Sequence, residues 1–144
     1  MNIKDVNEWL IMADDDFDSA NILNAQERKH NEIICYLCAQ AAEKYLKGYL
    51  IYNDIVPERT HNLFYLNSIC IEKNKYFENI KTECGFLNRF ANDIRYPHKM
   101  ETNIEDINVA IKYVEKIKNI EPLKKLRNDI KNDLEKDVKQ PNCT

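Results

Sequence analysis

The sequence predicts an all-α fold, an up-down antiparallel bundle of four to five helices followed by a C-terminal helix. Apolar residues recur every three or four positions along most of the 144 residues, which is the spacing of an amphipathic helix. Only two glycines and four prolines are present, whereas folds built from many short strands need frequent turn residues. Short loops between long helical segments favour the up-down arrangement.

The first two helices are predicted over residues 5–26 and 31–52. The apolar positions of the first are Val6, Trp9, Leu10, Ala13, Phe17, Ala20 and Leu23. The second helix carries two apolar stripes, one of Ile34, Leu37, Cys38, Ala41, Tyr45 and Tyr49, the other of Cys35, Ala39, Ala42, Leu46 and Leu50. A helix that is apolar on two faces is expected to lie at the centre of the bundle. We therefore expect Tyr45, Tyr49 and Tyr52 to pack in the core rather than to stack on bases.

Three shorter helical segments follow. Thr60 is expected to cap a third helix whose inward residues are Leu63, Leu66, Ile69 and Cys70. A fourth helix is predicted over residues 77–94. It has to end before Pro97, because a proline disfavours the helical conformation at the residue before it. Thr102 with Glu105 three residues later predicts a capping box at the start of a fifth helix, which carries Ile104, Ile107, Ile111, Val114 and Ile117.

Pro122 marks a boundary near the C-terminus, so the sequence predicts two units. Residues 1–121 form the helical domain, and residues 122–144 form a C-terminal helical extension with a short flexible end. The extension carries a narrow stripe of Leu123, Leu126, Ile130, Leu134 and Val138. Such a stripe either packs back on the bundle or serves as an interface with another molecule, and both possibilities stay open.

Composition excludes several classes of protein. The net charge of −3 does not fit a globally basic nucleic-acid binder, but it leaves a local basic patch open. Gly48 and Gly85 are too far apart to form a glycine-rich phosphate loop, which excludes Walker-type nucleoside triphosphatases and Rossmann dehydrogenases. No run of 18 apolar residues predicts a membrane span. The five cysteines are odd in number and lack the spacing of a disulfide framework, so we expect reduced thiols and a cytoplasmic protein.

No metal or cofactor site is expected. Cys35 and Cys38 lie three residues apart on the core side of a predicted helix, and no second cysteine or histidine pair has zinc spacing. They are interpreted as buried structural thiols. The acidic run of Asp14, Asp15, Asp16 and Asp18 points in several directions around its helix and is interpreted as a solvated face.

Two groups of residues have the chemistry to bind an anion. Lys44 and Lys47 lie on one face of the second helix, where two ammonium groups can hold a phosphate. The alternative is a solvated face on which Glu43 offsets Lys47 four residues later. The segment from Arg95 to His98 offers a guanidinium fork and an imidazole, which together suit phosphodiester chemistry without a metal. The alternative there is a cationic helix terminus.

Four motifs in order resemble the HEPN domain family (higher eukaryotes and prokaryotes nucleotide-binding). The most specific is the run from Cys38 to Leu50, CAQAAEKYLKGYL, which is similar to that family's "AQQAAEKALKALL" helix. The opening helix with Trp9, Ala13 and Ala20 resembles the family's first helix. The turn THNL at residues 60–63 and the tripeptide RYP at residues 95–97 are similar to two further motifs of the family.

The resemblance implies an all-α, HEPN-like bundle that forms a homodimer, often beside a minimal nucleotidyltransferase in a toxin–antitoxin-like pair. Many HEPN proteins are metal-independent ribonucleases that use an Arg-x(4–6)-His motif. Here the positions that would hold this histidine after Arg95 are Met100, Glu101 and Thr102, and His98 is only three residues from Arg95. The best-known catalytic motif is therefore missing, which favours a protein that is not an enzyme.

Three hypotheses follow, in this order. The first is a homodimeric binding module for a nucleotide or a nucleotidyltransferase partner, without a catalytic residue, whose site residues are Lys44, Lys47, His61, Arg95 and Tyr96. The second is a metal-independent endoribonuclease toxin, in which Arg95 stabilises the phosphate and His98 or His61 is the general base. The third is a non-catalytic helical interaction protein.

Overall fold

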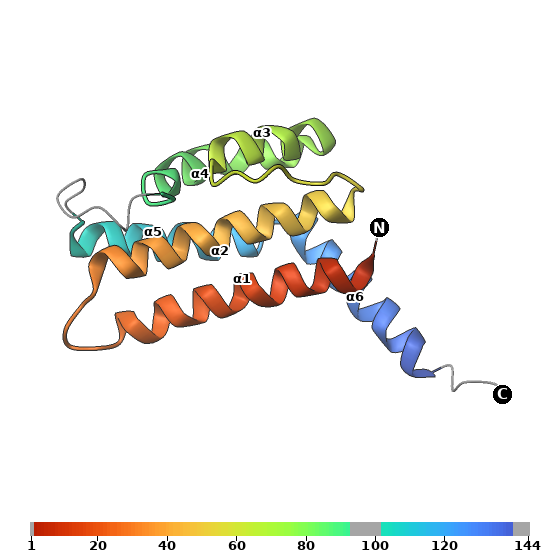
Figure 1. Ribbon diagram of the computed structural model, residues 1–144, viewed down its shortest axis with the longest axis horizontal. Helices are drawn as coiled ribbons and strands as arrows, with labels where there is room; N and C mark the ends of the chain where they lie inside the picture. Colours follow the sequence, from red (N-terminus) through yellow and green to blue (C-terminus); the bar gives the residue numbers. More distant parts are fainter. Residues whose placement is uncertain (1, 93–101, 140–144) are drawn as a thin grey trace.

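The structure is a computed structural model that describes residues 2–92 and 102–139. Its α-helices are α1 (Ile3–Asn24), α2 (Asn31–Tyr52), α3 (Leu63–Lys73), α4 (Lys81–Asn88), α5 (Ile104–Lys118) and α6 (Glu121–Lys139). A 3-10 helix, η1 (Lys75–Ile80), joins α3 to α4, and the described residues contain no strand (Figure 1). The prediction of an all-α bundle is confirmed.

Helix α2 is the centre of the bundle, as its two apolar stripes predict. It contacts α1, α3, α4, α5 and α6. Helices α1 and α2 run antiparallel beside each other, and α3 and α4 lie on the opposite side of α2 from α1 (Figure 1). The bounds of α2 agree with the range of residues 31–52 predicted from the sequence.

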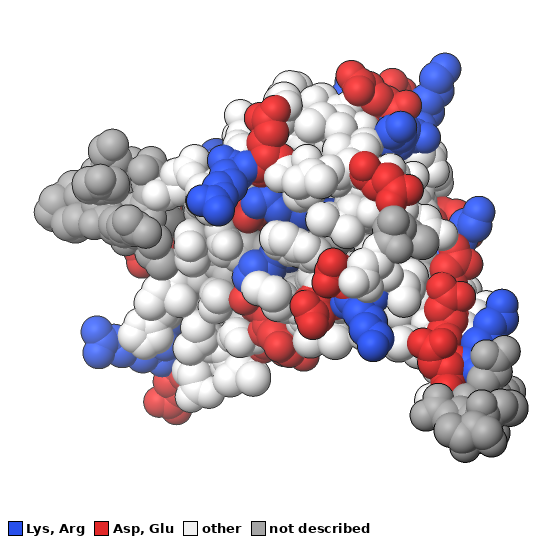
Figure 2. Space-filling view, turned by 45° about the vertical axis from the view of Figure 1, so that its right-hand side comes forward, with Lys and Arg blue, Asp and Glu red and all other residues white. Residues whose placement is uncertain are grey.

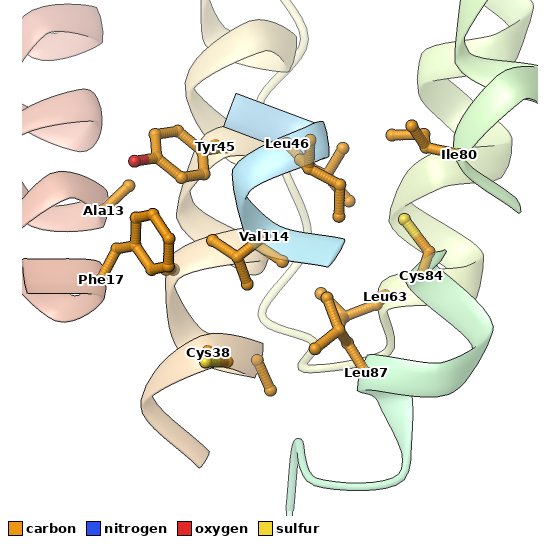
Figure 3. Close-up of a cluster of buried hydrophobic side chains, with 14 of the residues drawn as sticks. Ala13, Phe17, Cys38, Tyr45, Leu46, Leu63, Ile80, Cys84, Leu87 and Val114 are labelled. Carbon is orange, nitrogen blue, oxygen red and sulfur yellow. The ribbon is translucent and has the colours of Figure 1, made fainter. Parts of the chain in front are cut away.

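One continuous core joins the helices around α2 (Figure 3). On one side of α2, Ala13 and Phe17 of α1 face Tyr45, and on the other side Leu46 faces the apolar side chains of α3, η1 and α4. Tyr45 and Leu46 are both 0% exposed. Tyr45 and Tyr49 therefore belong to the core, as predicted.

Gly48 allows the close approach of α1 and α2. A Cβ atom at this position would lie 3.2 Å from Cδ2 of Leu10 and 3.4 Å from Cβ of Trp9. Both distances leave little space for a larger side chain, so a glycine inside α2 serves packing despite its low helix propensity.

Two predicted helix caps are wrong by one or two residues. The cap of α3 is Asn62, whose Oδ1 accepts a hydrogen bond from the backbone N–H of Tyr65, whereas Thr60 accepts one from the N–H of Asn62. The capping box of α5 is formed by Asn103 and Asp106, not by Thr102 and Glu105. Asparagine caps a helix as well as threonine does, so neighbouring candidates cannot be separated by residue type alone.

The helix predicted over residues 77–94 is also shorter than expected. Its first residues belong to η1, which Asn74 caps through the N–H of Tyr76, and α4 ends at Asn88. The side chain of Asn88 accepts a hydrogen bond from the backbone N–H of Leu63, which ties the end of α4 to the start of α3. Ile94 and Pro97 lie outside the described residues.

Helix α6 packs on the bundle over most of its apolar stripe but not at its end. Along its apolar stripe, Leu123, Leu126 and Ile130 are buried, Leu134 is half-buried, and Val138 is 83% exposed. In Figure 1 the end of this helix projects away from α1 and α2. The stripe thus packs back on the bundle as far as Leu134, which is one of the two possibilities, and an interface with another molecule at the end of the helix stays a prediction.

The acidic run of α1 is not simply a solvated face, because Asp14 anchors α6. Its two oxygens accept hydrogen bonds from the guanidinium of Arg127 at 2.8 and 3.1 Å, and the hydroxyl of Tyr45 donates to Oδ1 at 2.5 Å. Lys118 also lies 3.7 Å from Oδ1. A second contact of α6 is the hydrogen bond that Tyr52 donates to Asp129. The prediction of a solvated face is wrong for Asp14.

The described cysteines are free thiols, as predicted. Cys35, Cys38, Cys70 and Cys84 are buried and form no disulfide with one another. Burial raises the pKa of the Cys35 and Cys84 thiols to about 12, which keeps them protonated at neutral pH. Cys143 lies outside the described residues. Within residues 2–92 and 102–139, none of the helices combines the length and the apolar character that a membrane crossing needs.

Candidate functional site

A polar face of α2 is built around the two lysines singled out in the sequence. Gln40, Glu43, Lys44 and Lys47 recur at helical spacing and so point to the same side of α2. Lys44 forms an ion pair with Asp16 of α1. Lys47 donates to Oε2 of Glu43 at 3.1 Å, and these two side chains are only 9% and 5% exposed. The interpretation of Lys47 and Glu43 as a solvated face is therefore wrong, although their pairing is confirmed.

Glu43 also contacts His61, which brings a second sequence-predicted residue to this face. The Nδ1 atom of His61 lies 2.8 Å from Oε1 of Glu43. The ammonium of Lys47 lies 5.8 Å from the centre of the Trp9 ring, close enough for a cation–π interaction. We call Glu43, Lys47, His61 and Trp9 the Glu43 cluster.

Local structure fixes the position of His61. This residue precedes Asn62, which caps α3. The backbone N–H of Leu63, the first residue of α3, donates a hydrogen bond to the side chain of Asn88 at the end of α4. The turn before α3 is thus held from two sides, and its histidine lies over the middle of α2. The imidazole is 57% exposed, whereas the carboxylate beneath it is buried. His61 is accordingly the most exposed member of the Glu43 cluster.

Both lysines of the predicted site already have carboxylate partners. Lys44 is matched by Asp16, and Lys47 by Glu43. With a neutral imidazole the Glu43 cluster has no net charge, and with a protonated imidazole it has a charge of about +1. The exposed positive charge that this site offers to an anion therefore depends on His61 rather than on the lysines.

Arg95, Tyr96 and His98 lie outside the described residues. Whether Arg95 and Tyr96 join Lys44, Lys47 and His61 in one site stays a prediction. The described chain reaches Asn92 before this segment and resumes at Thr102.

Sequence reasoning missed Glu43 as a site residue, treating it only as a partner of Lys47. The available signal was a charged residue within the apolar run of α2, between Ala42 and the buried Tyr45. Gln40 belongs to the same face, and its side-chain Nε2 is buried without a hydrogen-bond partner. Such atoms are uncommon in folded proteins.

Charges of both signs are mixed on the face of the molecule that Figure 2 presents, where Lys and Arg side chains are interspersed with Asp and Glu side chains. An apolar groove of about 440 Å³ lies elsewhere, between α1 and α6, and is lined by Asn7, Leu10, Arg127, Ile130, Lys131, Leu134, Glu135 and Val138. This groove shares no residue with the Glu43 cluster.

Metal ligation is not supported among the described residues. No group of three or more His, Cys, Asp or Glu side chains there is placed to hold a metal ion. The partners of Glu43 are an ammonium and an imidazole, so its two oxygens are already engaged. The Glu43 cluster can present an oriented imidazole, that of His61, to a ligand.

Comparison with known proteins gives one family and one fold. The model of the HEPN domain matches residues 6–126. The crystal structure of an archaeal HEPN homologue is similar with a TM-score of 0.60 and 22% sequence identity, over 87% of this chain and 97% of that chain. At this identity the likeness shows the fold alone. No curated protein matches the chain.

Proposed function

Because the chain belongs to the HEPN domain family, we propose that it is a HEPN-domain binding protein, a homodimer that binds a nucleotide or a minimal nucleotidyltransferase partner in a toxin–antitoxin-like module. One observation carries this proposal: the family match spans residues 6–126, yet no histidine stands five to seven residues after Arg95. A HEPN fold without its ribonuclease pair keeps a binding role and lacks the usual catalytic one.

The proposed ligand site is formed by Lys44, Lys47, His61, Arg95 and Tyr96. The exposed imidazole of His61 supports it, because the contact of Nδ1 with the buried Glu43 orients the ring and leaves its other side open to a ligand. Arg95 supplies the planar fork that suits a phosphate. Lys44 and Lys47 would add longer-range attraction, which their carboxylate partners weaken.

The test is a calorimetric titration of the purified protein with ATP, GTP and a short RNA at low and moderate salt. We expect binding that weakens as salt rises, because charged contacts are screened. Arg95→Ala should weaken binding about tenfold or more, the effect of losing a charged hydrogen bond. Arg95→Lys should restore only part of the affinity that Arg95→Ala loses, since a point charge does not reproduce the guanidinium fork.

Absence of heat with every ligand, and no change on Arg95→Ala, would remove the nucleotide part of the proposal. The partner part needs no nucleotide and is tested separately by co-purification from the native host, where a nucleotidyltransferase should accompany the protein. If neither a nucleotide nor a nucleotidyltransferase binds, the remaining hypothesis is the non-catalytic helical interaction protein.

The homodimer is tested by sedimentation at tens of micromolar. Several large apolar side chains of α1 support an interface, since Ile11, Met12 and Ile22 are 49%, 47% and 63% exposed. We expect a sedimentation coefficient that fits two copies. A monomer at this concentration contradicts the proposal.

A second candidate is a metal-independent endoribonuclease, and the contact of His61 with Glu43 favours it, because a carboxylate behind an imidazole suits a general base. Purified protein would then cleave RNA in EDTA, and both Arg95→Ala and His61→Asn would abolish cleavage. Intact RNA after long incubation removes this candidate.

A further inference from the structure

The contact between His61 and Glu43 determines which ring nitrogen carries the hydrogen. An ionised carboxylate only accepts hydrogen bonds, so Nδ1 of His61, at 2.8 Å from Oε1, has to be the donor. The other oxygen of Glu43 accepts a hydrogen bond from the ammonium of Lys47 at 3.1 Å, so both carboxylate oxygens act as acceptors. In the neutral ring the hydrogen therefore lies on Nδ1, and Nε2 keeps its lone pair.

We infer that Glu43 is a positioning residue for His61, holding the ring as the Nδ1–H tautomer so that Nε2 is the atom that meets a ligand. The Glu43 side chain is 5% exposed and the His61 side chain 57% exposed, so the carboxylate lies beneath the ring and solvent reaches the imidazole. The tautomer is inferred from the contact between Nδ1 and Oε1 alone. The role of Nε2 toward a ligand also depends on the proposed nucleotide site.

The ligand chemistry that this arrangement favours is a phosphate group. When the ring takes up a proton, Nε2–H donates to a phosphate oxygen, and Glu43 then lies between two cations, Lys47 and the imidazolium. One carboxylate balances one of these charges, so about one positive charge remains to face the phosphate. Lys47 does not make this contact itself, because its side chain is 9% exposed and its ammonium is directed to Glu43 and Trp9.

Nitrogen NMR of the full chain, labelled with ¹⁵N in its histidines, tests the tautomer. The spectrum is recorded at about pH 8.5, where an ordinary imidazole is neutral. Nδ1 of His61 should give the shift of a protonated nitrogen and Nε2 that of an unprotonated one. His30 is the internal control, because it is exposed and does not cap α2 with its side chain, so its ring should show the tautomer mixture of a free histidine.

Glu43→Gln is the matched variant, since it keeps the shape of the side chain and removes its charge. The amide can present its NH₂ group to the ring, so the His61 signals should shift toward the Nε2–H tautomer while those of His30 stay unchanged. Circular dichroism verifies that the variant is folded. Should it not fold, the wild-type spectrum alone still decides, because it reports the tautomer directly.

The ligand arm uses ATP as the probe, with wild type and Glu43→Gln titrated in parallel. At about pH 6, where an ordinary imidazole is largely protonated and its Nε2–H can donate to a phosphate, we expect about tenfold weaker binding in the variant, because the neutral amide leaves the imidazolium without its counter-charge. A wild-type His61 that shows the Nε2–H tautomer, or the same mixture as His30, overturns the inference and leaves the nucleotide site itself standing. An Nδ1–H tautomer without any ATP binding overturns the ligand role of Nε2 and the proposed nucleotide site, but not the positioning of the ring.

Discussion

Replacing Leu46 by aspartate is expected to lower the free energy of unfolding by about 4–5 kcal/mol or more, the largest effect of any change described here. Leu46 is 0% exposed and lies between α2 and the layer of α3, η1 and α4 (Figure 3). The substitution removes apolar contacts and places a carboxylate among the buried apolar side chains of the core. Thermal or urea unfolding followed by circular dichroism measures the change.

Leu46→Met is the matched control, because it conserves volume and apolar character. Its cost should stay below about 1.5 kcal/mol. If Leu46→Asp unfolds at the same temperature as wild type, the assignment of this face of α2 to the core is wrong. An equal loss in both variants would mean that the site is sensitive to shape rather than to charge.

Asp14→Ala is expected to cost about 3 kcal/mol, the second largest effect. The carboxylate is 29% exposed and joins three helices, since Arg127 of α6 and Tyr45 of α2 both donate to it. Its removal leaves the guanidinium without a counter-charge and the hydroxyl of a buried tyrosine without its acceptor. Urea unfolding at neutral pH measures the loss.

Asp15→Ala is the control for this prediction. Asp15 is the next residue of the same acidic run, but its side chain is exposed, so the change should stay within about 0.5 kcal/mol. Similar losses in both variants would contradict the role of Asp14 as the anchor of α6.

The stabilisation by Asp14 should depend on pH in one direction. Burial acts to raise the pKa of Asp14, but the hydrogen bonds from Arg127 and Tyr45 outweigh it and hold the pKa below the ordinary value of 3.8. A carboxylate with a lowered pKa in the folded state stabilises the fold above about pH 4 and loses this contribution as the pH falls through the folded pKa. The difference between wild type and Asp14→Ala should therefore shrink below about pH 4.

The central features of the fold could be predicted from the sequence because they depend on long apolar stripes. Helix α2 has two such stripes over five turns, and its bounds and central place follow from them. Helix caps depend instead on which of several neighbouring polar residues reaches a free N–H. Thr60 and Asn62, or Thr102 and Asn103, are equivalent by type, and only the path of the chain separates them.

The candidate site was harder to predict because its chemistry depends on burial and on long-range contacts. The spacing of Glu43 and Lys47 predicts their pairing, but not that both are buried. The contact of His61 with Glu43 joins residues 18 positions apart across a loop, which no local pattern indicates. The same holds for Asp14 and Arg127, which are 113 positions apart.

The most direct test of the central claim is one calorimetric titration in EDTA, followed by analysis of the recovered ligand. ATP or a short RNA is added to wild type and to His61→Asn, and the ligand is then separated and examined for cleavage. A HEPN-domain binding protein without catalysis predicts saturable binding to wild type, much weaker binding to His61→Asn, and ligand that is recovered intact. Cleaved RNA, or equal binding to both proteins, would contradict it.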